Sequence, residues 1–363
     1  MNTALKKSVL ATAIVLTTGL FINCNQKKIT TNDDFKEEIT ENTVAFSFNE
    51  AINLRKPVVF ITGIDQGNET FYHNSRLFFK DHNYQVIEDQ YSLEEIINWL
   101  NHNESEKPYG EIHIVNKSNA FKGLTLETVI NGEKVTTESL RKHITKGTLP
   151  ILQESINANS KIIFHANGLG DNKELLNTFK DALCADELPS IVASPYYSVF
   201  DGAFTQHYLA KPYYIFYPTA NSPGKVDLSK EIAKKYPEEK DINWLDALQN
   251  YEERFIGEPY TKQFTIPLKF KLDYHNSDEE VPNFENQDEI IDFIEQQEVL
   301  FFEVEQLKIP IEKYRWSYSM HNSTLTIKGK ATVLVVLKPL IKPYGDLQYI
   351  TPDTNNKRLY AIN

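Results

Sequence analysis

Residues 111–124 and 161–179 each contain an apolar strand that runs directly into small polar residues. In the second segment, the turn His-Ala-Asn-Gly at 165–168 leads into the pattern of a helix. Apolar strands that alternate with helices are typical of a mainly parallel sheet covered on both faces. Side chains in such turns lie at the carboxyl edge of the sheet, where open α/β sheets bind ligands. The two turns are therefore the first candidates for a functional site.

The two turns resemble the catalytic turns of caspase-like cysteine peptidases, a group that includes gingipains and the bacterial CHAT proteins. In that family one strand ends in Ser-His-Gly and a neighbouring strand in Ala-Cys or Gly-Cys, which brings a histidine base to a cysteine nucleophile. This chain has Asn116-Lys117-Ser118 and Ala166-Asn167-Gly168 at those places. Three further segments resemble an uncharacterised bacterial branch of the family: 122–144, 255–270 and 309–318. The resemblance implies a caspase-like sheet whose His/Cys dyad is replaced by Lys117 and Asn167.

These two replacements remove the family's chemistry. A cysteine reacts as a thiolate, and a nearby histidine accepts its proton. Asn167 has no ionisable nucleophile, and the ammonium of Lys117 is not a proton acceptor at neutral pH. The lysine could instead donate a hydrogen bond to the amide of Asn167 and hold the two turns together. The alternative is a solvated lysine beside a favourable Asn-Gly turn.

A displaced catalytic group is the alternative to an inactive site. Because strand side chains alternate with a period of two, His165 is expected on the same face as Asn167. There it could act with a hydroxyl such as Ser194 or Ser118, although a histidine in this position is more often hydrogen-bonded within the sheet. Cys184 follows the next helix and is expected to be a buried small hydrophobe at the opposite end of the sheet.

Other catalytic signatures are absent from the sequence. There is no Walker sequence, paired-glycine dinucleotide fingerprint, HExxH or CxxC, and the nine histidines lack metal-ligand spacing, so we expect neither cofactor nor metal. Asp65 follows the apolar strand 57–62 and is a candidate ligand-binding residue, although residues 63–67 also fit a simple turn.

The amino terminus has the order of a lipoprotein signal. Lys6 and Lys7 precede the apolar residues 8–21, a stretch shorter than the roughly 20 residues that span a bilayer. Phe-Ile-Asn-Cys follows and resembles a lipoprotein processing site with Cys24 as the acylated residue. We expect a signal peptide at 1–23 and a flexible tether at 24–45. Because Asp does not follow the cysteine, the resemblance implies a Gram-negative outer membrane. A plain secretory signal, giving a periplasmic or secreted protein, is the alternative.

Composition supports a folded body rather than a nucleic-acid-binding protein. The hydrophobic content is 41% with 21 Phe and 19 Tyr, and the formal charge of −12 argues against nucleic acid as a partner. The expected partners are a membrane, through the lipid anchor, and an unidentified peptide or envelope protein. The sequence thus predicts a non-catalytic binding lipoprotein, a pseudo-peptidase, with an active hydrolase as the alternative.

The periodicity of apolar residues predicts a caspase-like α/β domain at 46–255 and a strand-rich α+β segment at 256–363. In the first part we expect strands at 57–62, 84–88, 111–115, 161–166, 191–194 and 213–217. Helices are expected at 69–80, at 93–101 with Ser92 as N-cap, and after a hairpin through Asn131-Gly132 with a cap near Thr137. In the second part we expect strands at 260–274, 314–320 and 324–337 around a helix at 288–298.

Overall fold

A computed structural model describes residues 55–63, 70–103, 107–119, 121, 123–183, 189–200, 206–218, 223–254, 257–275, 281–341 and 351–363. Residues 48–363 belong to one compact unit. The expected signal peptide and tether lie outside the described residues, as do Cys24, Asp65 and Cys184.

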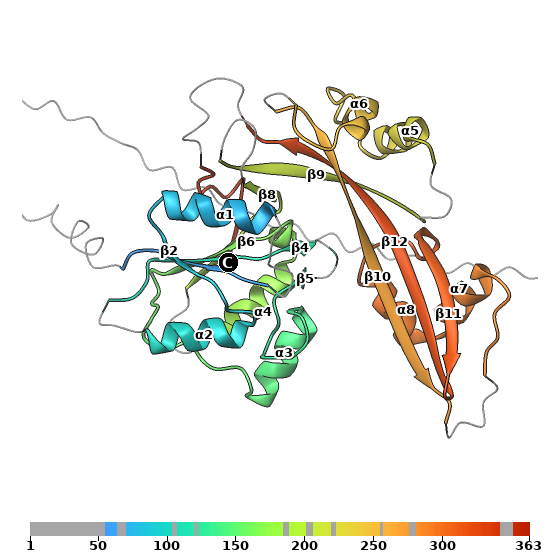
Figure 1. Ribbon diagram of the computed structural model, residues 1–363, viewed down its shortest axis with the longest axis horizontal. Coiled ribbons are helices and arrows are strands. Elements are labelled where there is room, and N and C mark those ends of the chain that lie inside the picture. The colour runs from blue at the N-terminus through green and yellow to red at the C-terminus, as the bar shows by residue number, and fades with distance from the viewer. Residues whose placement is uncertain are drawn as a thin grey trace, which may run out of the picture. The chain divides into compact units, whose positions relative to one another are not determined.

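The first sheet has six strands in the order β13-β7-β6-β3-β1-β2 (Figure 1). Five of them are mutually parallel, and β13 pairs antiparallel with β7 at one edge. The strands are β1 (Val58–Ile61), β2 (Gln85–Ile87), β3 (Glu111–Val115), β6 (Lys161–His165), β7 (Ser190–Ala193) and β13 (Ala361–Ile362). The prediction of a mainly parallel sheet is confirmed.

Helices cover both faces of this sheet (Figure 1). Phe60 packs with α2 (Leu93–His102) and α4 (Lys173–Leu183) on one face, whereas Val59 and Ile61 pack with α1 (Thr70–Asp81) on the other. The alternation of side chains along a strand separates these two cores. Ser92 caps α2 as predicted, since its hydroxyl accepts a hydrogen bond from the backbone N of Glu95 at 3.2 Å.

The strand order places a topological switch point between β1 and β3, because β2 lies on one side of β1 and all later strands on the other. After β3 the chain forms a short antiparallel pair, β4 (Ser118–Asn119) with β5 (Gly123–Leu124). The predicted hairpin at Asn131-Gly132 is a turn with one isolated bridge, Glu127 to Lys134, rather than a strand pair. The next helix, α3 (Thr137–Lys146), is capped by Thr136.

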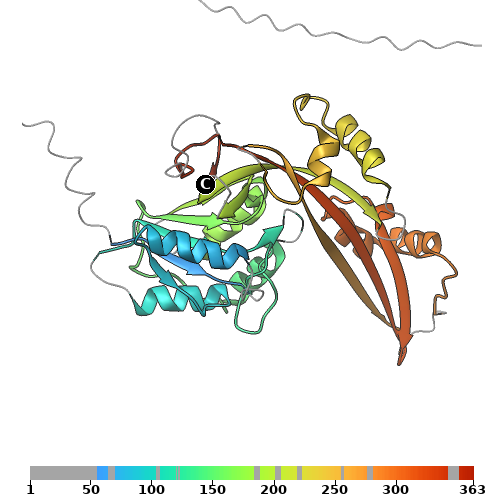
Figure 2. The same ribbon diagram turned by 45° about the horizontal axis from the view of Figure 1, so that its top comes forward.

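The second sheet is antiparallel and has the order β10-β12-β9-β8, with β11 paired to the remaining half of β12. Its strands are β8 (Tyr197–Phe200), β9 (His207–Pro218), β10 (Tyr260–Asp273), β11 (Tyr314–His321) and β12 (Thr324–Pro339) (Figure 2). The strands β10, β11 and β12 were predicted from sequence. The strand predicted at 213–217 is part of the longer β9 and lies in this sheet, whereas β13 returns to the first. The expected boundary at residues 255 and 256 lies outside the described residues.

Two pairs of helices cover opposite faces of the second sheet. Helices α7 (Gln287–Gln296) and α8 (Glu298–Glu305) pack on Ile266 and Phe270 of β10, at the end where β11 pairs with β12. Helices α5 (Lys225–Lys235) and α6 (Trp244–Gln249) pack on Tyr213 and Ile215 of β9. Short 3₁₀ turns occur at Leu169–Asp171 and Ile311–Lys313. None of the helices within the described ranges has both the length and the hydropathy to cross a membrane.

Candidate functional site

The two polar turns are neighbours at the carboxyl edge of the first sheet. Strands β3 and β6 pair in register up to Val115 and His165, so residues 117 and 167 follow adjacent strand ends. The hydroxyl of Ser118 donates to the main-chain oxygen of Asn167 at 3.0 Å. The side-chain oxygen Oδ1 of Asn167 is buried and, among the residues that the structure describes, has no hydrogen-bond partner. The expected bond from Lys117 to this amide oxygen is therefore absent, and Ser118 makes the contact instead.

The turn after β6 is held against the end of β7 by its glycines. Gly168 has a φ of +74°, a conformation that side chains with a Cβ rarely adopt. Gly170 donates from its backbone N to the main-chain oxygen of Ser194 at 2.9 Å. A Cβ added to Gly170 would lie 2.5 Å from the backbone N of Pro195 and 2.6 Å from the oxygen of Ala193. The local sequence Asn-Gly-Leu-Gly thus permits a close backbone approach that positions Asn167.

Asn116 closes the neighbouring turn after β3, and it is fully buried. Its Nδ2 donates to the main-chain oxygen of Thr62 at 2.6 Å. Its Oδ1 accepts from the backbone N atoms of Thr125 at 2.9 Å and Leu126 at 3.3 Å. One amide thus joins the end of β1 to the segment after β5. The sequence analysis assigned no role to this residue, although a polar residue directly after a buried strand is the signal that would have identified it.

The switch point between β1 and β3 is filled by protein atoms next to Gly63. A Cβ at Gly63, which has a φ of +135°, would lie 2.4 Å from Nδ2 of Asn116 and 3.0 Å from the hydroxyl of Tyr72. The same hydroxyl accepts from the backbone N of Lys117 at 2.9 Å. Close to Gly63, this crevice is therefore a structural junction. Asp65, the candidate ligand-binding residue, follows it outside the described part of the chain.

His165 is buried within the sheet. Its Nε2 is hydrogen-bonded to Nδ1 of His113 at 2.8 Å, and the two rings stack with centroids 5.1 Å apart. Phe79 lies 5.2 Å away, centroid to centroid. Burial, followed by the nearby charge of His113, holds the pKa of His165 well below its usual value. His165 is thus a neutral, hydrogen-bonded core residue.

The hydroxyls considered as partners of His165 are occupied elsewhere. Ser194 donates to the main-chain oxygen of Leu359 at 2.8 Å and accepts from the backbone N of Tyr196 at 3.0 Å. Ser118 donates to Asn167, as described above. Each hydroxyl proton is therefore committed to a carbonyl oxygen and not to an imidazole nitrogen.

His165 belongs to a buried chain of histidines that the sequence analysis missed. Glu111 Oε2 lies 3.4 Å from Nε2 of His113, and this interaction lowers the pKa of Glu111. His207 of β9 lies against His165 with ring centroids 5.5 Å apart, and its Nε2 is hydrogen-bonded to the hydroxyl of Ser198 at 2.8 Å. Burial lowers the pKa of His207 to about 3, with smaller contributions from the charges of neighbouring histidines. The spacing of Glu111 and His113 on one strand face was the available signal.

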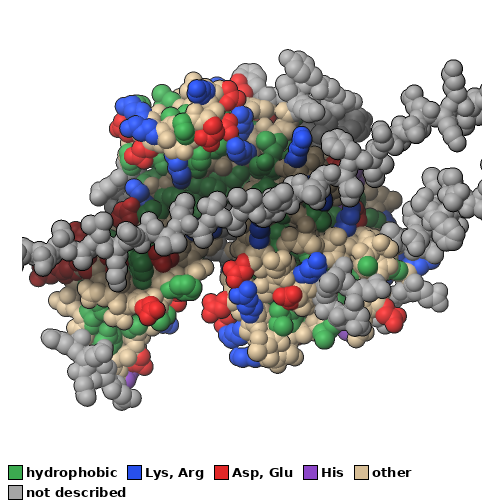
Figure 3. Space-filling model, turned by 180° about the vertical axis from the view of Figure 1, so that it is seen from behind, with side chains coloured by type: hydrophobic (Ala, Val, Ile, Leu, Met, Phe, Trp, Pro, Cys, Tyr) green, Lys and Arg blue, Asp and Glu red, His purple; other side chains and the backbone are tan. Residues whose placement is uncertain are grey.

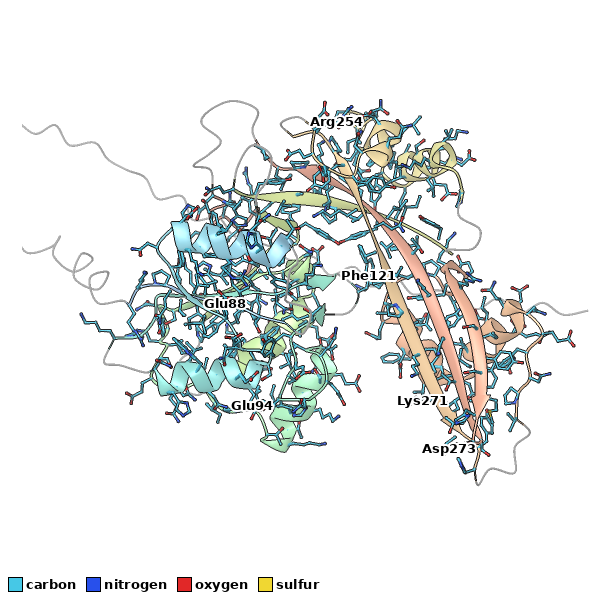
Figure 4. The ribbon with its side chains drawn as sticks, viewed as in Figure 1. Glu88, Glu94, Phe121, Arg254, Lys271 and Asp273 are labelled. Carbon is cyan, nitrogen blue, oxygen red and sulfur yellow. The ribbon has the colours of Figure 1, made fainter. Side chains whose placement is uncertain are left out.

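The loop after β3 also contacts the second sheet. Phe121 packs on Tyr214 and Phe216 of β9, with ring centroids 5.2 and 5.5 Å apart, as the position of Phe121 in Figure 4 illustrates. Burial, followed by the charge of Lys117, lowers the pKa of Lys262 in β10. Lys117 at the edge of the first sheet and Lys262 in the second therefore lie close enough for their charges to interact.

Among the described residues, no group of three His, Cys, Asp or Glu side chains is arranged to hold a metal ion. No protein family, curated protein or solved structure matches this chain.

Proposed function

We propose that this protein is a lipid-anchored, non-catalytic binding protein of the cell envelope, built on a degenerate caspase-like α/β domain. The observation that carries the proposal is the arrangement at the carboxyl edge of β3 and β6. Two polar turns are tied together by Ser118 and Asn167, and the amide oxygen of Asn167 is buried with no partner within the described ranges. Such an arrangement supports binding rather than catalysis, because no nucleophile lies beside a base, and a ligand would reach the amide oxygen only if the turn opened.

The unpartnered oxygen of Asn167 favours a ligand with an N–H donor. Leaving a buried acceptor unsatisfied costs about 1–3 kcal/mol, which a donor from a ligand would recover. A peptide offers such donors along its main chain and at its amino terminus. A peptide or an extended segment of an envelope protein therefore suits this edge.

The alternative is a hydrolase that uses His165 with a hydroxyl. A general base must reach its nucleophile at about 2.6–3.2 Å, directly or through one water. His165 is instead bonded to His113, while Ser118 and Ser194 donate to carbonyl oxygens. These contacts favour binding over hydrolysis.

The experiment is a peptide array probed with the full chain, with cleavage of the bound peptides followed by mass spectrometry. We expect binding without cleavage, lost in Asn167→Leu and retained in the control Asn177→Leu, which changes an exposed asparagine of α4. Cleavage that disappears in His165→Gln would support the hydrolase instead. Equal binding by the wild type and Asn167→Leu would show that the peptide does not bind at the carboxyl edge of β3 and β6.

The anchor is tested separately with Cys24→Ser. We expect the wild type in the membrane fraction and the variant in the soluble fraction, because the variant lacks the acyl acceptor. Identical soluble behaviour of both proteins would contradict the anchor and leave the binding edge untouched.

A further inference from the structure

Part of one face of the second sheet carries five exposed cations. In β10 they are Lys269 and Lys271, in β12 Lys328 and Lys330, and in β11 Arg315. Residues directly opposite each other in a sheet, and residues two apart along a strand, share a face. We call these five residues the basic face. Figure 4 labels Lys271 on β10, beside Asp273 at the end of that strand.

The basic face contains like charges at directly opposed positions. Lys269 is opposite Lys328, and Arg315 is opposite Lys330. Such cross-strand pairs destabilise a sheet. Within the described residues, none of the five cations forms an ion pair with a carboxylate, and Asp273 is the one acidic residue in β10, β11 and β12. The chain has a formal charge of −12, so the scarcity of acid within these three strands runs against its composition; beside β10, the acidic side chains of Glu298 and Glu303 in α8 line a shallow cavity with Lys269 and Lys271.

The same face shows a different arrangement where α5 and α6 cover it. Lys211 of β9 is opposite Lys338 of β12, another like-charge pair. Glu239 bridges it, with oxygens 2.8 Å from Lys211 and 3.0 Å from Lys338, and Asp241 adds a contact of 2.8 Å to Lys338. Figure 3 shows acidic and basic side chains side by side in the region of α5 and α6. The covered pair is neutralised by the protein, whereas the five cations of the basic face form no ion pair within the described part of the chain.

The side chains between the cations indicate which anion fits. Ser317, Ser319 and Thr326 lie on the same face and can donate hydrogen bonds to phosphate oxygens. No Phe, Tyr or Trp of these three strands lies on it, so the base-stacking platforms of single-strand nucleic-acid sites are missing. The surface is an open pleated sheet, with cations about 7 Å apart along a strand and about 5 Å apart across strands. An extended layer of phosphates matches this better than a small anion does.

We propose that the basic face binds the surface of an anionic lipid bilayer through its phosphate headgroups. Charges beyond about 8 Å are screened at physiological ionic strength, so the local cations act despite the negative charge of the whole chain. Each Lys or Arg near an anionic membrane strengthens binding about five-fold. This surface lies on the second sheet and does not depend on the peptide-binding edge of the first. A lipid anchor would raise its effective concentration at the membrane.

The test is flotation of the full chain carrying Cys24→Ser, which removes any acyl contribution, with two kinds of vesicle. One contains phosphatidylcholine and phosphatidylglycerol in a ratio of about 3:1, and the other phosphatidylcholine alone; binding is expected only to the first and only at low salt. The double variant Lys269→Gln/Lys328→Gln should bind about 25-fold more weakly, since two cations are removed. The control Lys146→Gln/Lys234→Gln changes two exposed helical lysines and the same net charge, and should bind like the parent.

Thermal melting distinguishes loss of binding from loss of structure. Lys269→Gln/Lys328→Gln should melt at the same temperature as the parent or higher, because a like-charge pair is relieved. If this variant fails to fold, Arg315→Gln/Lys330→Gln provides the equivalent change at the second pair. Equal binding to both vesicles, equal loss in the control, or tighter binding to a DNA duplex than to the anionic vesicles would overturn the proposal.

Discussion

Two asparagines at adjacent strand ends should respond very differently to the same substitution. Asn116 satisfies the main-chain oxygen of Thr62 and the backbone N–H groups of Thr125 and Leu126. The Oδ1 of Asn167, by contrast, has no partner in the part of the chain that the structure describes. Replacement of Asn116 by leucine removes its three hydrogen bonds to main-chain groups and a fourth from the hydroxyl of Thr125. At Asn167 it removes an unsatisfied oxygen.

The expected magnitudes follow from these contacts. The backbone N of Thr125 keeps a second bond, to the main-chain oxygen of Lys117, so two main-chain groups are left unpaired at about 1–3 kcal/mol each and Asn116→Leu should lose about 2–6 kcal/mol. That is a large part of the roughly 5–15 kcal/mol that stabilises a typical domain. Asn167→Leu should change the free energy of unfolding by less than about 1 kcal/mol, because no side-chain oxygen bond is lost. Urea denaturation followed by tryptophan fluorescence measures both.

Asn116→Asp provides a second measurement if the leucine variant does not fold. The buried carboxyl would have a raised pKa, so its neutral form favours the folded state. The Asn116→Asp variant should be most stable below about pH 3.9, the pKa of an aspartate carboxyl in the unfolded chain. Its free energy of unfolding should decline as the pH rises above that value. Similar losses for Asn116→Leu and Asn167→Leu, or a pH-independent Asn116→Asp, would refute the reasoning.

Three further outcomes are expected. Gly170→Ala should lose about 1–3 kcal/mol, since its Cβ meets backbone atoms, whereas Gly224→Ala, with no atom within 4 Å of the added Cβ, should be nearly neutral in the same thermal melts. The depressed pKa values of His165 and His207 stabilise the fold only while the imidazoles are neutral, so urea midpoints should fall as the pH drops below about 6.5; a flat profile would contradict their burial. Ser118→Ala should cost about 0.5–1.5 kcal/mol in urea denaturation, because it removes the bond from the hydroxyl to the main-chain oxygen of Asn167; an unchanged stability would contradict that bond.

Local periodicity was sufficient to predict most strands and helices, because apolar spacing and the Ser92 cap act within a few residues. It could not assign β9 to a sheet, since an apolar alternating strand has the same pattern in either one. The sequence predicted that the turns after β3 and β6 are neighbours, but it did not predict which side chain joins them. Which of Lys117 and Ser118 reaches Asn167 depends on the backbone path beyond the strand.

The histidine chain was missed for a related reason. His113 and His165 meet through the pairing of β3 with β6, and His207 joins them from the second sheet. These are contacts between distant segments that no local pattern encodes. The basic face, by contrast, was visible as alternating lysines in β10 and β12, but its meaning required the register that opposes them.

The return of the chain to the first sheet at β13 determines when the first sheet can be completed during synthesis and which fragments of the protein can fold. The backbone of Ile191 in β7 exchanges two hydrogen bonds of 3.0 Å with Asn363, so the first sheet acquires its last strand only after the whole second sheet has been synthesised. A fragment spanning 46–255 would keep β8 and β9 without their partner β12, and would leave the edge of β7 open to other chains. Such a fragment should aggregate, whereas an excision of residues 197–340 with a short linker would retain every strand of the first sheet. The second sheet is thus inserted in the chain between β7 and β13 of the first sheet. The chain therefore passes from one sheet to the other twice, and both connections would have to be cut to separate the two sheets.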